Sequence, residues 1–193
     1  MYYFIMKNFF KIFLTLLILS NFVLAQDVKE VKDKAIALYV TKNYDEAKKI
    51  LESLPINQKD SETFLLLSNI AQENGNDNLA IKYLNNAIDK DNTYYRAYYN
   101  LGCILAKRKS YNLASKNFEL ALQFKKDFSP AYYNLALCRM KEGNYSEAKK
   151  DLIKALQYDP KNKDCMYNLA YCYKKLNKLK QAQKILDKYN EST

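Results

Sequence analysis

Apolar residues spaced three and four positions apart recur along residues 28–193, and a short polar segment follows each such stretch. This spacing places the apolar side chains on one face of a helix. Small residues occupy the same point in successive stretches, and alanine marks that point most clearly because it returns every 33 or 34 residues. The recurring alanines are Ala47, Ala80, Ala114, Ala148 and Ala182. A fixed period in the thirties predicts a small unit that cannot bury its own apolar face and stacks with further copies into a solenoid.

Alignment on these alanines divides the chain into five units, each long enough for two antiparallel helices. The units are 28–60, 61–94, 95–128, 129–162 and 163–193. Gly75 and Gly143, each followed by Asn, are typical of a helix end with a left-handed backbone. Small residues such as Gly102 and Ala136 allow neighbouring helices to approach closely. The sequence therefore predicts about five antiparallel helix pairs.

Unit 129–162 shows the pattern most completely. Its recurring positions are Tyr132, Leu135, Ala136, Gly143, Asn144, Tyr145, Ala148, Leu152, Ala155 and Pro160. This pattern resembles the tetratricopeptide repeat, a helix pair of about 34 residues, and the resemblance covers about 28–193. It implies an all-α, right-handed superhelical solenoid that binds other proteins or peptides as a scaffold or adaptor. The first unit departs from the pattern, because Lys34 takes the leucine position and Pro55 is placed to shorten the second helix.

The last expected helix, residues 178–189, alternates Lys and Gln with Ile185 and Leu186. A terminal unit of a solenoid needs a polar outer face, because no further unit covers it. We therefore expect this helix to act as a polar cap.

Residues 1–25 differ from the repeats and predict a secretory signal peptide. Lys7 and Lys11 precede an apolar run over residues 12–24, and Val23 and Ala25 are small residues suited to cleavage before Gln26. Cleavage there would leave 26–193 as the tetratricopeptide-like domain of an exported protein, periplasmic or secreted. The alternative is an uncleaved helix that anchors the protein in a membrane, with the repeats outside the cytoplasm organising a cell-envelope complex.

Composition argues against catalysis and against nucleic-acid binding. The chain has no His, which removes His-based triads, His zinc sites and the usual general acid–base residue near neutral pH. The formal net charge is +10, but the lysines are spread over every unit and form no stripe with interleaved aromatic residues. We expect no enzyme activity, no cofactor, no metal site and no nucleic-acid partner.

The resemblance also implies a binding face, because the first helices of tetratricopeptide arrays line a concave groove. Glu62, Leu65 and Asn69 fall on this face in the second unit. Further along, the candidate peptide-binding residues are Tyr99, Lys107, Tyr133, Leu137, Met140, Lys141, Tyr167, Tyr171, Lys174 and Lys175. Tyrosine recurs at one position and lysine at another, a ladder suited to a protein or peptide partner with acidic or aromatic side chains. The alternative is that both residues reflect the usual composition of such repeats.

Four cysteines lie in the expected first helices of the last three units: Cys103, Cys138, Cys165 and Cys172. Cys103 and Cys138 occupy neighbouring positions on adjacent units and are the geometrically plausible disulfide pair in an oxidising compartment. Cys165 and Cys172 are separated by roughly 10 Å along one helix, too far for a bridge. The alternative is that all four are small apolar core residues.

Overall fold

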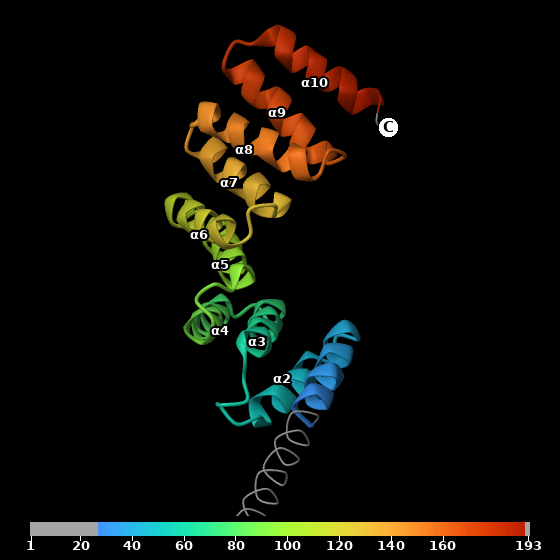
Figure 1. Ribbon diagram of the computed structural model, residues 1–193, viewed down its shortest axis with the longest axis vertical. Helices are drawn as coiled ribbons and strands as arrows, with labels where there is room; N and C mark the ends of the chain where they lie inside the picture. The colour runs from blue at the N-terminus through green and yellow to red at the C-terminus, as the bar shows by residue number, and fades with distance from the viewer. Residues whose placement is uncertain (1–26, 192–193) are drawn as a thin grey trace, which may run out of the picture.

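The computed structural model describes residues 27–191, and all regular structure in this range is helical. Residues 27–40 form the first described helix. It is followed by α2 (Tyr44–Ser53), α3 (Ser61–Glu73), α4 (Asp77–Lys90), α5 (Tyr95–Lys107), α6 (Tyr111–Phe124), α7 (Ser129–Lys141), α8 (Tyr145–Tyr158), α9 (Lys163–Lys175) and α10 (Leu179–Glu191). The helices stack in pairs along the long axis of the molecule, from blue at the N-terminal end to red at the C-terminal end (Figure 1). The predicted all-α solenoid of about five helix pairs is confirmed, whereas the predicted signal peptide lies outside the described residues.

One kind of turn joins the two helices of every pair. A residue with a left-handed backbone ends each first helix, and the five residues are Lys42, Gly75, Lys109, Gly143 and Asn177. After the glycines, the N–H of Asn76 donates to the carbonyl of Ala71 and the N–H of Asn144 donates to that of Arg139, each at 2.8 Å. These bonds satisfy carbonyls at the helix end and turn the chain back on itself. The repeated turn therefore makes the helices of each pair antiparallel.

The first unit is irregular, as the sequence indicates. α2 has 10 residues, against 14 in α4, and Leu54 is extended with ψ 138° before Pro55. A residue before proline is disfavoured in the helical region, so the helix ends early. Lys34 is exposed, whereas Leu135 at the same position of the fourth unit is 2% exposed.

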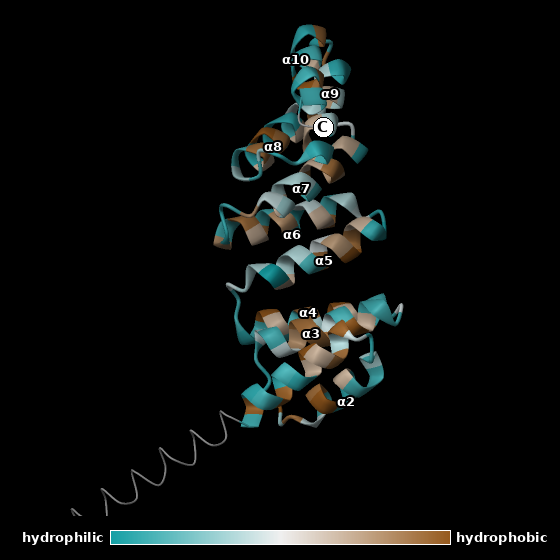
Figure 2. Ribbon diagram, turned by 90° about the vertical axis from the view of Figure 1, so that its right-hand side faces the viewer, coloured by the Kyte–Doolittle hydropathy of each residue, from teal (hydrophilic) through white to brown (hydrophobic). Residues whose placement is uncertain are grey.

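The core lies between neighbouring helices and is built from small residues facing large ones. The recurring alanines are fully buried in the first four units, and Ala182 is 7% exposed. Phe118 on α6 is also fully buried, and a Cβ added at Gly102 on α5 would lie 2.6 Å from its ring. Figure 2 shows that hydrophobic and hydrophilic residues alternate within the helices of every layer. Burial of one face of each helix by the next pair therefore holds the array together.

A partly buried charge cluster joins α6, α7 and α8. The Arg139 guanidinium lies 2.5 Å from the Glu119 carboxylate on α6 and 2.6 Å from the Asp151 carboxylate on α8. The Asp151 side chain is 10% exposed and that of Glu119 is 51% exposed. Burial raises the pKa of the Asp151 carboxyl to about 6, although the neighbouring Arg139 opposes this shift.

This raised pKa makes stability depend on pH with a definite sign. The native state binds the Asp151 proton more tightly than the unfolded chain, in which Asp titrates near ~3.9. The resulting stabilisation is fully present below about pH 4 and is lost as the pH rises through about 6. We expect the wild type to lose on the order of 2 kcal/mol relative to Asp151→Asn between pH 4 and pH 7. Urea unfolding of both proteins across this range measures the difference, and parallel stability curves would contradict it.

All four cysteines are free thiols in the structure. Cys138, Cys165 and Cys172 are buried, and Cys103 is partly buried. Burial raises the pKa of the Cys138 and Cys172 thiols to about 11 and that of Cys165 to about 12. These are the surroundings of small core residues rather than of reactive thiols.

Within residues 27–191, no helix has both the length and the apolar character needed to cross a membrane. The same residues contain no group of three or more His, Cys, Asp or Glu side chains arranged to hold a metal ion.

Candidate functional site

Five of the ten candidate residues meet in one pocket between α7 and α9. Leu137, Met140 and Lys141 of α7 face Tyr167 and Tyr171 of α9 across it. Tyr145 at the start of α8 and Asn168 of α9 complete the lining. The sequence-based prediction did not include these two residues. The volume is about 430 Å³, and we call this site the α7–α9 pocket.

Two aromatic rings form one wall of the α7–α9 pocket, and a lysine outside its lining lies against them. The Tyr145 and Tyr171 rings meet edge to face with centroids 6.1 Å apart. The Lys175 ammonium lies 5.4 Å from the Tyr171 ring centroid and 5.9 Å from that of Tyr145. Attraction between the cation and the ring faces holds Lys175 beside the pocket. Lys141 adds a second exposed cation.

The other two tyrosines of the predicted ladder, Tyr99 and Tyr133, connect neighbouring units through their hydroxyls. Asn134 donates a hydrogen bond of 3.0 Å to the Tyr99 hydroxyl, and Asn168 donates one of 3.1 Å to the Tyr133 hydroxyl. Burial raises the pKa of both phenols. Tyr167 has no such donor among the described residues and is 59% exposed. The recurrence of Asn at 100, 134 and 168 was the sequence signal for these bonds.

The lysines of the predicted ladder also differ in whether they have a partner in the preceding unit. The Lys107 ammonium lies 3.2 Å from the Asp77 carboxylate of the preceding unit. Lys141, Lys174 and Lys175 form no ion pair with any described carboxylate, and Lys174 lines a neighbouring pocket rather than the α7–α9 pocket. The available positive charge therefore lies at the C-terminal half of the first-helix face.

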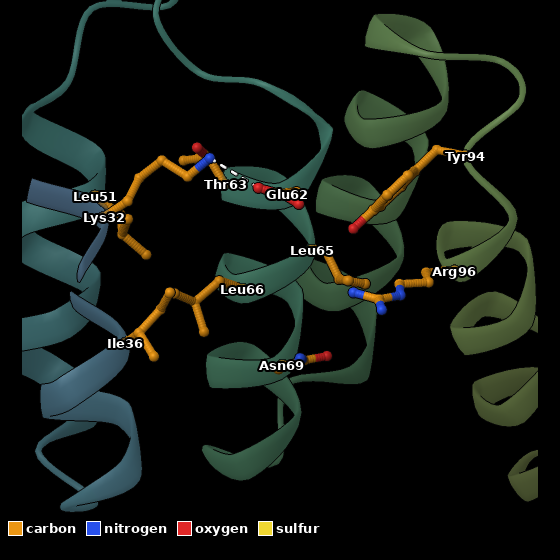
Figure 3. A pocket seen from close by; sticks show the side chains of 10 residues that line it. All are labelled: Lys32, Ile36, Leu51, Glu62, Thr63, Leu65, Leu66, Asn69, Tyr94 and Arg96. Carbon is orange, nitrogen blue, oxygen red and sulfur yellow. Dashed lines mark hydrogen bonds and ion pairs between the residues drawn. The ribbon is translucent and has the colours of Figure 1, made fainter. Parts of the chain in front are cut away.

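A second pocket, of about 230 Å³, lies at the N-terminal end of the same face (Figure 3). Its lining includes Glu62, Leu65 and Asn69 of α3, as the resemblance implies, and also Lys32 and Arg96. The Lys32 ammonium is 2.9 Å from the Glu62 carboxylate, whereas Arg96 extends toward α3 beside Leu65. This end therefore offers charges of both signs beside apolar side chains, whereas the charged residues at the α7–α9 pocket, Lys141 and Lys175, are both positive.

Known proteins match this chain in both sequence pattern and fold. Residues 17–161 match the family model described as the tetratricopeptide repeat protein 21 C-terminal ARM domain, and residues 139–193 match the model described as a tetratricopeptide repeat. No curated protein sequence matches the chain.

Two similar solved structures are of MamA. A crystal structure of the MamA protein is 22% identical, covers 86% of this chain and 91% of that chain, and has a TM-score of 0.74. MamA 41-end from Desulfovibrio magneticus RS-1 is 20% identical, covers 86% of this chain and 94% of that one, and also has a TM-score of 0.74. At these identities the likeness concerns the fold alone.

Arrays of this architecture present extended surfaces that bind other proteins, and such scaffolds are generally not enzymes. The first of the two family models spans well over half of the chain. Its match agrees with the stacked helix pairs and with the turn repeated in each of them. The chain belongs to the tetratricopeptide repeat family.

Proposed function

We propose that this protein is an exported scaffold that binds a segment of another protein along its first-helix face, with the α7–α9 pocket as the main anchor. The observation that carries the proposal is that Tyr167, Tyr171 and Lys141 line one pocket together with Leu137 and Met140, and that Lys175 lies beside it. These side chains suit a segment with acidic and aromatic residues.

The chemistry of recognition follows from the two kinds of side chain. A partner's aromatic ring would stack against Tyr167 or Tyr171, whose exposed fractions are 59% and 39%. A partner's carboxylate would lie near Lys141 and Lys175, which no described carboxylate neutralises. Lysines act here as point charges that steer the partner and fix its position more than they add affinity.

Reversing both charges beside the pocket tests this proposal. For Lys141→Glu with Lys175→Glu, we expect affinity for a labelled peptide of alternating Glu and Phe to fall by about tenfold at low salt. The effect should shrink as salt rises, because exposed charges are screened. Fluorescence anisotropy measures the affinity.

Lys107→Glu is the matched control, because Lys107 lies on the same face but is paired with Asp77. It should leave binding nearly unchanged. Equal losses for Lys107→Glu and for the double variant, or no loss in either, would contradict the role of the α7–α9 pocket.

The export part of the proposal rests on residues 1–25. The lysines before the apolar run and the small residues before Gln26 support cleavage by a signal peptidase. N-terminal sequencing of the protein from the exported fraction should give Gln26 as the first residue. An intact N-terminus in the membrane fraction would favour the anchored alternative, in which the repeats organise a cell-envelope complex.

A further inference from the structure

The last described layer of the array carries an open pocket that adjoins the anchor proposed above and shares Tyr167 and Tyr171 with it. It has a volume of about 190 Å³ and is lined by Tyr167, Ala170, Tyr171, Lys174, Ala182 and Leu186. In Figure 1, α9 and α10 form this layer, and no described helix lies beyond them. We call the pocket the α9–α10 slot. The helix α10 therefore acts as the expected polar cap only on the side that bears its Lys and Gln residues.

The repeat register shows what this surface is. The residues 34 positions earlier are Tyr133, Ala136, Leu137, Met140, Ala148 and Leu152. All of these except Leu137 belong to the core that packs against Cys165, Leu169 and Cys172 of α9. Leu152 is fully buried there, whereas Leu186 remains partly exposed. The α9–α10 slot therefore repeats, without its helix, the surface that seats α9 one unit earlier.

We infer that the α9–α10 slot binds an amphipathic helix of a partner protein, seated as α9 is seated on α7 and α8. The seated helices share a pattern of a small apolar residue, Asn three positions later, Leu at the fourth and a small apolar residue at the seventh. The corresponding residues are Ala131, Asn134, Leu135 and Cys138 in α7, and Cys165, Asn168, Leu169 and Cys172 in α9. In both helices the Asn donates to a tyrosine hydroxyl of the preceding unit. Tyr167 offers that acceptor to the incoming helix.

The net charge of the C-terminal unit indicates which residues suit the flanks of the partner helix. Residues 163–191 contain seven lysines and three carboxylates, so a helix with acidic residues on its flanks complements this end. A second copy of the chain fits poorly. Its first described helix carries Glu30, Asp33 and Lys34, all exposed, at the positions that Cys165, Asn168 and Leu169 take in α9. The slot would leave those charges buried and unpaired.

A designed helix tests the inference. The probe is a fluorescein-labelled peptide of about 18 residues with the pattern Ala-x-x-Asn-Leu-x-x-Ala and Glu on its outer face. Anisotropy titration with the full chain should give saturable binding that Leu186→Glu weakens by about tenfold or more. Leu179→Glu is the matched control, because Leu179 lies on the same helix and is 61% exposed but lies outside the slot.

Two further measurements distinguish binding in the α9–α10 slot from binding in the α7–α9 pocket and from self-association. Replacing the peptide Asn by Ala should weaken binding several-fold for the wild type but not for Tyr167→Phe, which lacks the hydroxyl acceptor. Lys141→Glu, which alters the α7–α9 pocket, should leave this peptide's affinity unchanged. Binding that fails to saturate up to about 1 mM, or equal losses for Leu186→Glu and Leu179→Glu, would overturn the inference. So would self-association in sedimentation that Leu186→Glu abolishes, since a second copy would then be the occupant.

Discussion

Replacing Arg139 by Met is expected to lower the free energy of unfolding by about 3 kcal/mol at pH 7. Among residues 27–191, Arg139 is the one cation paired with Asp151, whose side chain is 10% exposed. Its loss leaves a buried carboxyl that must either stay charged without a partner or take up a proton. The penalty should therefore be smaller at pH 5, where the proton is taken up at little cost. Urea unfolding of the variant and the wild type at both pH values measures this difference.

A paired substitution separates the charge effect from lost packing. Arg139→Met combined with Asp151→Leu replaces the buried pair by apolar side chains and should restore most of the stability, because such replacements are often neutral. Glu119 then remains with its side chain 51% exposed and solvated. If the double variant were less stable than Arg139→Met alone, the contribution of Arg139 would be packing of its alkyl chain rather than compensation of a buried charge.

The fold could be predicted from the sequence because its determinants are local and repeated. A period of 34 residues, glycine at two of the five left-handed turn positions and small residues at fixed positions all act within one unit. The irregular first unit could be predicted for the same reason, since Pro55 ends α2 through the conformation of Leu54 alone.

The candidate site could be predicted only in part, because its other determinants act between units. The position of Tyr99 on the first-helix face follows from the repeat, but its hydroxyl is bonded to Asn134, 35 residues later. Lys107 is likewise paired with Asp77, 30 residues earlier. Such bonds depend on how far one unit is rotated relative to the next; the recurring Asn marks the donors but does not fix this rotation. Tyr167 and Lys141, which line the pocket, have no hydrogen-bond or ion-pair partner in the adjoining unit among the described residues.

Replacing Phe118 by Ala is expected to lower the free energy of unfolding by about 3–5 kcal/mol, because a fully buried ring leaves a cavity that its neighbours cannot fill. The ring packs with Ala131, Leu135 and Cys138 of the following unit. The loss should therefore uncouple the third and fourth units. Urea unfolding should show a broader transition than in the wild type, because nearest-neighbour contacts carry cooperativity in a solenoid.

Gly102 provides a sharper test of the same contact. A Cβ at this position would lie 2.6 Å from the Phe118 ring, so Gly102→Ala should destabilise by about 2 kcal/mol although alanine favours helix formation. The equivalent pair in the fourth unit is Ala136 with Leu152, both fully buried. Gly102→Ala together with Phe118→Leu recreates that pair and should cost less than the two single changes added together.

The sign of the interaction energy between Gly102→Ala and Phe118→Leu distinguishes two explanations for the small residue at position 102. If small and large residues at the two positions compensate in size, the double variant recovers stability and the interaction energy is about 1–2 kcal/mol in its favour. Additive losses would instead mean that Gly102 is needed for the backbone of α5 and not for its approach to Phe118. The helix α5 is regular from Tyr95 to Lys107, and Gly102 does not have a positive φ. We therefore expect the two substitutions to compensate. A double-mutant cycle by urea unfolding measures the interaction energy.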